Sequence, residues 1–340
     1  MLVCGVTRVA NPEVVRESKN QNGRGGVLPL VSVVVLNHNG LTQNRDAFLR
    51  CLQSCVGSEY PNKEVLLVDN GSTDSSIPFV RSLYGERIRY VLLDRNLGYS
   101  GGMRAGARMV DPRARYIVFT NNDVFFPPET IGGLVGFLEA HPDVGVANCI
   151  EIVPRRDYNP GGTYLDMRLS HVPPRDLSKP YFVTAAENFF VIRRDVYERV
   201  GGFDPNFFQV YDDQDLCLRV WMSGYRVACD THYSVTHMHR LPNKKTPIRW
   251  YRHIRNRYIV ILKLYDPSFL AAYLPLRVIT DLYYSVFDPK WRSRRSIILV
   301  VRALRELVSK PNLFLPARER FMRVKKVSER ELLRLGILRP

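Results

Sequence analysis

The feature of this sequence that most constrains its fold is a regular alternation of apolar, β-branched runs with helical patterns between residues 31 and 120. The runs have the length and composition of buried strands, and polar or Gly-containing segments end them. Strands that alternate with helices at this spacing predict an α/β fold, with a mostly parallel sheet that carries helices on both faces. The expected strands are residues 31–36, 64–68, 89–93 and 116–120, the expected helices are 41–56, 75–83 and 101–110, and further strands are expected near 144–152 and 181–184.

Polar clusters follow three of the expected strands. They are residues 37–39 (NHN), 69–70 (DN) and 121–123 (NND). Each cluster alone is typical of a turn, because Asn and Asp favour loops. In an open α/β sheet, however, ligands bind at the carboxyl ends of the strands. Three clusters on the same edge therefore predict a binding site there.

An acidic cluster marks the start of a later helix. Residues 201–219 (GGFDPNFFQVYDDQDLCLR) place Asp212, Asp213 and Asp215 at the head of an amphipathic segment. In a helix, Asp213 falls on the face that carries the apolar side chains, so it would point inward. A carboxylate held there beside a substrate can take a proton from an attacking hydroxyl. The alternative is that these residues only cap the helix and complement its dipole.

The net charge of +16 is concentrated near the C-terminus. Residues 246–340 contain 21 Lys and Arg against 7 Asp and Glu, a net +14, so the remainder carries only +2. Such a segment predicts an anionic partner, either membrane lipid or nucleic acid. Amphipathic helices rich in Arg, Trp and Leu suit an anionic membrane surface. The alternative is a set of helices packed on the preceding domain with a solvated basic side.

Two further observations concern location. The longest apolar stretch, residues 268–287, is interrupted by Arg277 and Asp281, which argues against a membrane-spanning helix. No apolar run typical of a signal peptide occurs near the N-terminus, and no CxxC pair occurs. Cys51 and Cys55 share a helix face, and we expect them in the core. These features predict a reducing, cytoplasmic location.

Five segments together resemble the family 2 glycosyltransferases, most closely the rhamnosyltransferase-like branch. The resemblance covers roughly residues 29–240. It implies the GT-A fold, a Rossmann-like α/β fold with a mostly parallel mixed sheet, and an inverting transfer from a nucleotide-diphosphate sugar in polysaccharide biosynthesis. In chain order, the segments are VSVVVLNHNG, LLVDNGSTDSS, RNLGYSGGMRAG, FTNNDVFFP and GGFDPNFFQVYDDQDLCLR.

The resemblance also implies a donor-binding set at the strand ends. Asn37 and Asp69 would contact the nucleoside. Asn96 and Gly98, in RNLGYSGG, would lie along the donor, where glycines allow close backbone approach. The alternative for that loop is a sequence shaped only for turning. His38 and Asn122 complete the set.

A metal site is implied at the donor diphosphate. Asp123 matches the final residue of the family's DxD-type motif, which here reads NND and has one carboxylate. His237 fits the place of a metal-binding His after a strand, and His239 is the competing candidate. A Mg²⁺ or Mn²⁺ ion held by few protein ligands and by phosphate oxygens would neutralise the leaving group.

The resemblance also implies that Asp213 is the general base. Asp212 stands where the family usually has Glu. The arrangement parallels inverting glycosidases, with a sugar hydroxyl in place of water. Glu187-Asn188 occurs where the family often has small residues, which indicates either an acceptor pocket or a local repacking.

The predicted organisation is an N-terminal extension and linker (1–28), a GT-A catalytic domain (29–245) and a basic amphipathic helical region (246–340). The predicted acceptor is a glycan or a polyprenyl-linked glycan, with the enzyme peripheral on the inner face of the cell membrane and no nucleic acid bound. Two alternatives remain. A nucleotidyltransferase would need a Gly-rich, Lys-containing loop after the first strand, where LNHNGLTQNRD stands. A non-catalytic protein could bind nucleic acid through the basic tail.

Overall fold

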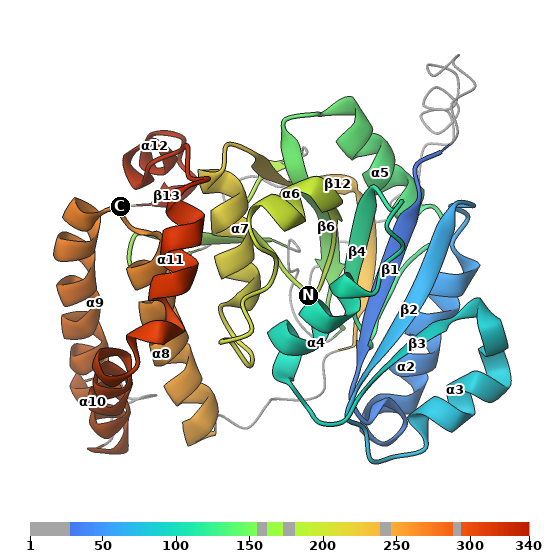
Figure 1. The fold of residues 1–340 in the computed structure, drawn as a ribbon, viewed down its shortest axis with the longest axis horizontal. Coiled ribbons are helices and arrows are strands. Elements are labelled where there is room, and N and C mark those ends of the chain that lie inside the picture. The colour runs from blue at the N-terminus through green and yellow to red at the C-terminus, as the bar shows by residue number, and fades with distance from the viewer. Residues whose placement is uncertain (1–27, 155–161, 173–180, 239–245, 288–293, 340) are drawn as a thin grey trace, which may run out of the picture.

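The computed structural model describes residues 28–154, 162–172, 181–238, 246–287 and 294–339. The N-terminal extension apart from Leu28, the linker within it, and His239 lie outside the described residues. Figure 1 shows a twisted sheet on the right, a group of helices on the left and α7 (Asp212–Met222) between them.

The expected parallel half of the sheet is confirmed. β1 lies between β2 and β4, and β3 pairs with the outer edge of β2, all in parallel. Alternate residues of β1 face two separate cores, since Val33 packs on one face and Val34 on the other. Helices therefore cover both faces. The elements are β1 Val31–Asn37, α2 Gly40–Gly57, β2 Lys63–Asn70, α3 Ser76–Tyr84, η1 Gly85–Arg87, β3 Arg89–Leu93, α4 Gly98–Arg108 and β4 Tyr116–Asn121.

The other half makes the sheet mixed. β11 pairs antiparallel with both β4 and β6, and β12 runs parallel to β6. Among the described residues this sheet has nine strands, in the order β3-β2-β1-β4-β11-β6-β12-β5, with β9 paired to β12. The helix α5, the strand β11 and the helix α6 were not predicted. The elements are β5 Val124–Phe125, α5 Thr130–Ala140, β6 Val144–Ile152, β9 Tyr181–Phe182, β11 Phe189–Arg193, α6 Arg194–Arg199 and β12 Arg226–His237.

A small second sheet and the C-terminal helices complete the fold. The helices share one apolar core with the main sheet, because Ile254 and Val300 belong to the same buried cluster as Val34 and Phe119. The chain ends by pairing β13 with β7. The elements are β7 Gly162–Asp166, β8 His171–Val172, β10 Ala185–Ala186, α8 Pro247–Leu264, α9 Pro267–Phe287, α10 Arg294–Ser309, η2 Pro311–Leu313, α11 Leu315–Met322, α12 Glu329–Arg334 and β13 Leu338–Arg339.

The helix α7 differs from the amphipathic helix that the sequence predicts. All eleven of its residues are buried, including three Asp and one Arg. The reason is tertiary: α7 contacts β6, β10 and β12 on the sheet side and α12 on the other, and it forms an ion pair with α8. The polar face of α7 is therefore buried as well as its apolar face.

Buried ion pairs join α7 to the C-terminal helices. The Nζ of Lys263 in α8 lies 2.6 Å from Oδ1 of Asp215 and 2.8 Å from Oδ2 of Asp204. Arg219 pairs with the other oxygen of Asp215, and its Nη2 lies 2.6 Å from Oδ2. All four side chains are buried. Removing one partner of such a cluster leaves an uncompensated charge and costs about 3–5 kcal/mol.

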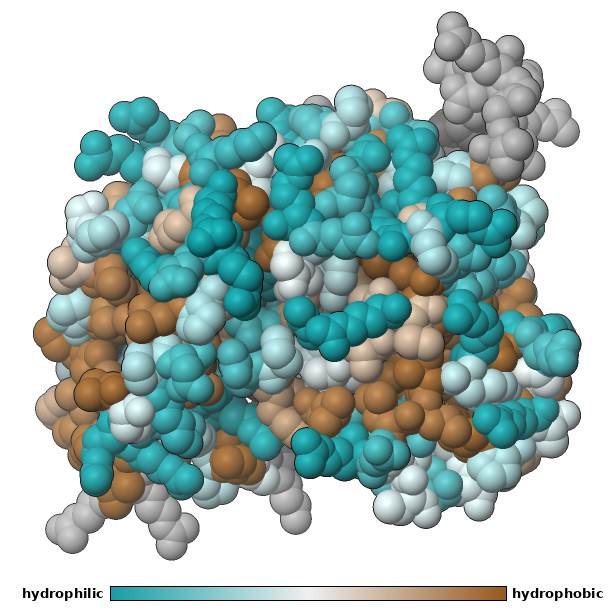
Figure 2. All heavy atoms as spheres, in the orientation of Figure 1, coloured by the Kyte–Doolittle hydropathy of each residue, from teal (hydrophilic) through white to brown (hydrophobic). Residues whose placement is uncertain are grey.

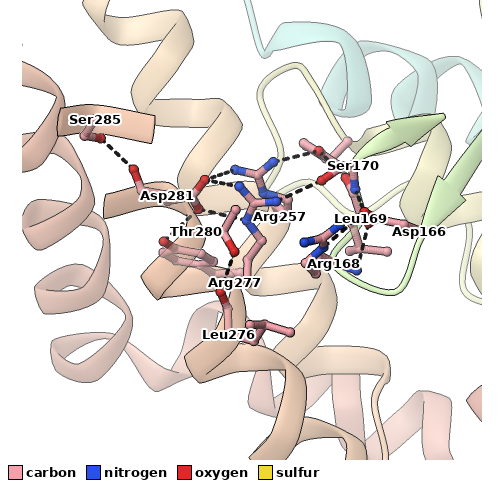
Figure 3. Close-up of polar contacts among 12 residues, drawn as sticks. Asp166, Arg168, Leu169, Ser170, Arg257, Leu276, Arg277, Thr280, Asp281 and Ser285 are labelled. Atoms are coloured by element: carbon pink, nitrogen blue, oxygen red, sulfur yellow. Dashed lines mark hydrogen bonds and ion pairs between the residues drawn. The ribbon is translucent and has the colours of Figure 1, made fainter. Parts of the chain in front are cut away.

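A second internal network explains the charges that interrupt the apolar stretch of α9. Arg277 and Asp281 pair within α9, and Arg257 of α8 reaches Asp281 at 2.7 Å (Figure 3). Arg277 also donates to Ser170 Oγ at 2.9 Å. These residues are buried inside the protein, so part of the basic region serves packing. Within the described ranges, no helix is both long enough and apolar enough to span a bilayer.

Candidate functional site

The ends of β1, β2 and β4 bring three of the predicted donor-binding residues together. Asn37 and Asp69 are register partners across β1 and β2. The Nδ2 of Asn37 donates to Asp69 Oδ1 at 3.1 Å and to Ser72 Oγ at 3.2 Å. Its Oδ1 accepts a hydrogen bond from Asn122 Nδ2 at 2.9 Å. This edge of the sheet therefore presents fixed amide and carboxylate groups.

A second network orders the loop that contains Asn96 and Gly98. Asn70 Nδ2 donates to Asn96 Oδ1 at 3.1 Å and to the carbonyl of Gly98 at 3.0 Å. Gly98 has φ +73°, and a Cβ there would lie 2.1 Å from the carbonyl oxygen of Phe208. Glycine is needed because the loop before α7 approaches so closely. His38 hydrogen-bonds through Nδ1 to the carbonyl of Asn70 at 3.1 Å.

The buried His237 lies between two carboxylates, of which Glu151 is buried and Asp123 is partly exposed. Its Nε2 is 3.2 Å from Asp123 Oδ1, and its Nδ1 is 2.7 Å from Glu151 Oε1. The pairing of His237 with Val124 across β12 and β5 creates this proximity. Burial alone would lower the pKa of His237, but the hydrogen bonds to Asp123 and Glu151 raise it to about 9.

The side chains of Asp123 and His237 fit a divalent ion as two of its ligands. Adjacent ligands of an octahedral ion with bonds of about 2.1 Å are about 3 Å apart, close to the separation seen here. Glu151 on Nδ1 would fix the ring orientation, as carboxylates do for metal-bound His. Within the described ranges, no three His, Cys, Asp or Glu side chains could hold an ion by themselves. The remaining ligands would be water and phosphate oxygens, which suits Mg²⁺.

Asp212 and Asp213 lie buried in the first turn of α7. Ser100 Oγ donates to Asp212 Oδ2 at 3.3 Å, and burial raises the pKa of Asp212 to about 6. Burial raises the pKa of Asp213 well above its usual range, and the Asp212 and Glu187 carboxylates raise it further. Among the described residues, Oδ1 of Asp213 has no hydrogen-bond partner. A carboxylate in this state can accept a proton from a bound hydroxyl.

Glu187 and Asn188 connect this acidic turn to the His237 arrangement. Glu187 accepts a hydrogen bond from Gln214, and its pKa is raised to about 7, first by burial and then by Glu151. Asn188 donates to Glu151 Oε2 at 2.9 Å. The proposed base and the proposed metal ligands thus belong to one continuous polar site.

Sequence reasoning missed Glu151. It is the one acidic residue in the buried run VGVANCIEI of β6, and that position was a usable signal, since a buried charge needs a partner. Ser72 and Tyr99 were also missed. Tyr99 lies in the first turn of α4, and its phenol lowers the pKa of Asp213, against the larger effect of burial.

Comparisons with known proteins identify the family of this chain. The family model described as "Glycosyl transferase family 2" matches residues 32–201. The chain is 25% identical over 227 residues to the O-antigen biosynthesis protein RfbC of Myxococcus xanthus, which covers 62% of this chain and 17% of that protein. It is 29% identical over 108 residues to the succinoglycan biosynthesis protein ExoO of Rhizobium meliloti (strain 1021), which covers 32% of this chain and 29% of that protein. The chain thus spans less than a third of the length of either relative.

Solved structures share the fold at low sequence identity. One is GalNAc-T7 with UDP, GalNAc and Mn²⁺, with a TM-score of 0.60, 15% identity, and coverage of 83% of this chain and 58% of that one. Another is the mannosyltransferase PcManGT from Pyrobaculum calidifontis with GDP-Man and Mn²⁺, with a TM-score of 0.52, 18% identity and coverage of 92% of both chains. A third is S. aureus TarS 1–349, with a TM-score of 0.56, 16% identity, and coverage of 91% of this chain and 92% of that one.

The raised pKa of Asp213 generates a prediction about stability. Because the pKa of Asp213 is raised in the folded state, protonation of Asp213 stabilises the folded protein. This stabilisation is lost as pH rises through the raised pKa. Asp213→Asn cannot ionise, so its Tm should exceed that of the wild type, with a gap that widens from pH 5 to pH 8. Thermal denaturation at both pH values measures this. The exposed Asp46→Asn is the matched control for the Asp-to-Asn change itself. A gap of equal size at pH 5 and pH 8 would contradict the assignment.

Proposed function

The chain belongs to glycosyltransferase family 2, and from this membership we propose that it transfers a sugar from a nucleotide-diphosphate sugar to an acceptor hydroxyl with inversion at the anomeric carbon. The observation that carries the proposal is Asp213, a buried carboxylate with an unpartnered oxygen at the start of α7. Membership accounts for the transferase class. The chemical roles rest on the geometry of the site.

Asp213 acts as the general base. It takes the proton of the acceptor hydroxyl while that oxygen forms a bond to the anomeric carbon. The bond from that carbon to the diphosphate oxygen breaks on the opposite face, which inverts the configuration, and the nucleoside diphosphate leaves with the electron pair. A base works best when its pKa lies near the working pH, and burial together with Asp212 and Glu187 moves the pKa of Asp213 in that direction.

The strand-end network holds the donor. Asn37, Asp69 and Asn122 are fixed by their mutual hydrogen bonds, so they can bind a nucleoside without further ordering. Asn70 forms hydrogen bonds with His38, Asn96 and Gly98 and so links them to the same edge of the sheet. Two structures of similar fold contain a nucleotide or nucleotide sugar, which supports a ligand of this class.

Asp123 and His237 would hold a Mg²⁺ or Mn²⁺ ion. When bound, such an ion neutralises charge on the leaving diphosphate. Glu151 keeps the His237 ring oriented through Nδ1. Support comes from the 3.2 Å approach of the two ligand atoms and from the Mn²⁺ in two structures of similar fold.

The acceptor is a glycan or a polyprenyl-linked glycan at an anionic membrane face. The names of the two relatives, O-antigen and succinoglycan biosynthesis proteins, support a polysaccharide product. Hydrophobic side chains gather over α9 (Figure 2), where Ile279 and Phe287 are 62% and 63% exposed. Ile298 of α10 is 61% exposed, and Arg302 and Arg305 of that helix are exposed as well. Apolar groups beside cations suit an anionic bilayer surface.

The first prediction from this function concerns the base. Asp213→Asn should lower kcat by about 10²–10⁴-fold, because the amide keeps the shape but cannot accept the proton. Binding of the donor should stay within about threefold of wild type, since nothing at the strand ends changes. A screen of nucleotide sugars for binding and hydrolysis with Mn²⁺ or Mg²⁺ identifies the donor, and calorimetry and turnover then separate the two effects. Asp46→Asn should behave as wild type. Turnover by Asp213→Asn near the wild-type rate would exclude this role.

The second prediction concerns the metal. Asp123→Ala and His237→Ala should each raise the concentration of Mn²⁺ needed for half-maximal turnover, and the double variant should show less than the sum of the two defects in free energy. Metal titrations of turnover measure this, with the exposed His141→Ala as control. Full activity of the wild type in excess chelator would refute the metal site.

The third prediction concerns the membrane. Ile279→Asp with Phe287→Asp should reduce co-sedimentation with anionic vesicles, because it removes the apolar contact that salt does not screen. The charge attraction that remains should weaken as salt rises, since screening acts over about 8–10 Å near physiological ionic strength. Leu83→Asp, at an exposed position of α3, is the control. Unchanged sedimentation of the α9 double variant would show that this surface is not the anchor.

A further inference from the structure

The backbone directly before Asp212 and Asp213 is strained. Val210 has φ +75° and Tyr211 has φ +65°, and Asp212 begins α7 immediately afterwards. Left-handed backbone is uncommon for any residue with a side chain and is an outlier for a β-branched one. Such conformations persist where the surrounding structure over-determines them, and they gather at functional sites.

Asn256 of α8 holds this strained segment. Its Nδ2 donates to the carbonyl of Gln209 at 3.0 Å and to the carbonyl of Val210 at 2.8 Å. Its Oδ1 accepts from Arg255 Nη1 at 2.8 Å. The amide orientation follows from these partners, because carbonyls only accept and a guanidinium only donates. The side chain is fully buried, so water does not replace these bonds.

Neighbouring contacts fix the residues on either side. The amide of Tyr99 donates to the carbonyl of Phe208 at 2.6 Å. The phenol of Tyr211 donates to the carbonyl of Leu169 at 2.6 Å. Between these points, Asn256 supplies the hydrogen bonds to two consecutive carbonyls. Without them, both carbonyls would lose these hydrogen bonds, and Val210 could relax toward negative φ.

We propose that Asn256 is a positioning residue for sugar transfer: its amide, bonded to the carbonyls of Gln209 and Val210, holds Val210 and Tyr211 in the left-handed conformation that aims Asp213 at the acceptor hydroxyl. The proposal rests on the proposed role of Asp213 as base. Asn256 touches neither substrate nor the reacting atoms. It acts through the backbone, because a turn that starts in another direction carries its carboxylate away from the hydroxyl. Misplacement of a catalytic group by about 1 Å can cost on the order of 10²-fold in rate.

A purely structural role for Asn256 makes a different prediction. If Asn256 served stability alone, its substitution would lower Tm in proportion to the lost hydrogen bonds. The turnover of the folded protein would stay unchanged. Positioning predicts a loss of kcat at temperatures where the variant is fully folded. The loss should come with little change in KM for the donor, because the strand ends are untouched.

The test compares Asn256→Ala and Asn256→Asp with Leu307→Ala in the full chain. Asp keeps the shape of Asn and removes the donors, so it serves if the Ala variant fails to fold. Leu307 is buried in α10 within the same apolar core, so its truncation destabilises without altering the hydrogen bonds to residues 209–210. The assay uses the nucleotide sugar selected by screening UDP-, GDP- and dTDP-sugars and measures hydrolysis with water as acceptor. Hydrogen exchange over residues 207–215 supplies a readout that does not depend on activity.

Both Asn256 variants should lower kcat by about 10–100-fold, with KM for the donor within about threefold, and should accelerate exchange over residues 207–215. Leu307→Ala should lower Tm with kcat within about twofold and without that local acceleration. Val210→Gly added to Asn256→Ala should recover at least threefold in kcat, because glycine takes positive φ without strain.

Wild-type kcat in both folded Asn256 variants would overturn the proposal, and so would a kcat loss matched by Leu307→Ala at equal Tm. If Asp213→Asn retains activity, the general-base role fails instead. In that case, faster exchange over residues 207–215 would still report whether Asn256 holds the loop.

Discussion

The burial of the carboxylates in the first turn of α7 determines which groups the surrounding elements must place beside them. A carboxylate removed from water is costly unless a cation or hydrogen-bond donors compensate it. Asp215 is compensated by Lys263 and Arg219. Asp213, two residues earlier, keeps an oxygen without a partner among the described residues. The same turn therefore contains one neutralised carboxylate that anchors the helix and one uncompensated carboxylate whose pKa is raised.

The register of the sheet gathers the remaining groups from distant parts of the chain. The antiparallel pairing of β11 with β4 brings Asn188 beside Asn121, and the pairing of β12 with β5 brings His237 to Asp123. Glu151, at the end of β6, hydrogen-bonds to both His237 and Asn188. A shift of β12 by one residue would turn His237 to the opposite face and break this arrangement.

The sequence predicted what local patterns determine. The apolar runs and their polar ends located β1 to β4 and the edge where Asn37, Asp69 and Asn122 meet, and the fold class was confirmed. It did not predict β11, a short run of five residues, or the burial of α7 on all sides, because both depend on distant partners. Asn256 was missed for the same reason, whereas the place of Glu151 within an apolar strand was a usable signal. Nothing local distinguishes Asn256 from a solvent-facing Asn, and its role depends on a loop 46 residues earlier.

Lys263 also has a consequence for how such enzymes can change their outer parts. The buried cation that neutralises Asp204 and Asp215 comes from α8, whereas Asp204 precedes α7 and Asp215 lies in its first turn. The two regions thus share this buried ion-pair cluster as well as one apolar core. An exchange of the helical region between family members, by recombination or by design, would leave Asp204 without this cation unless the incoming helix placed an ammonium or guanidinium group at the same depth.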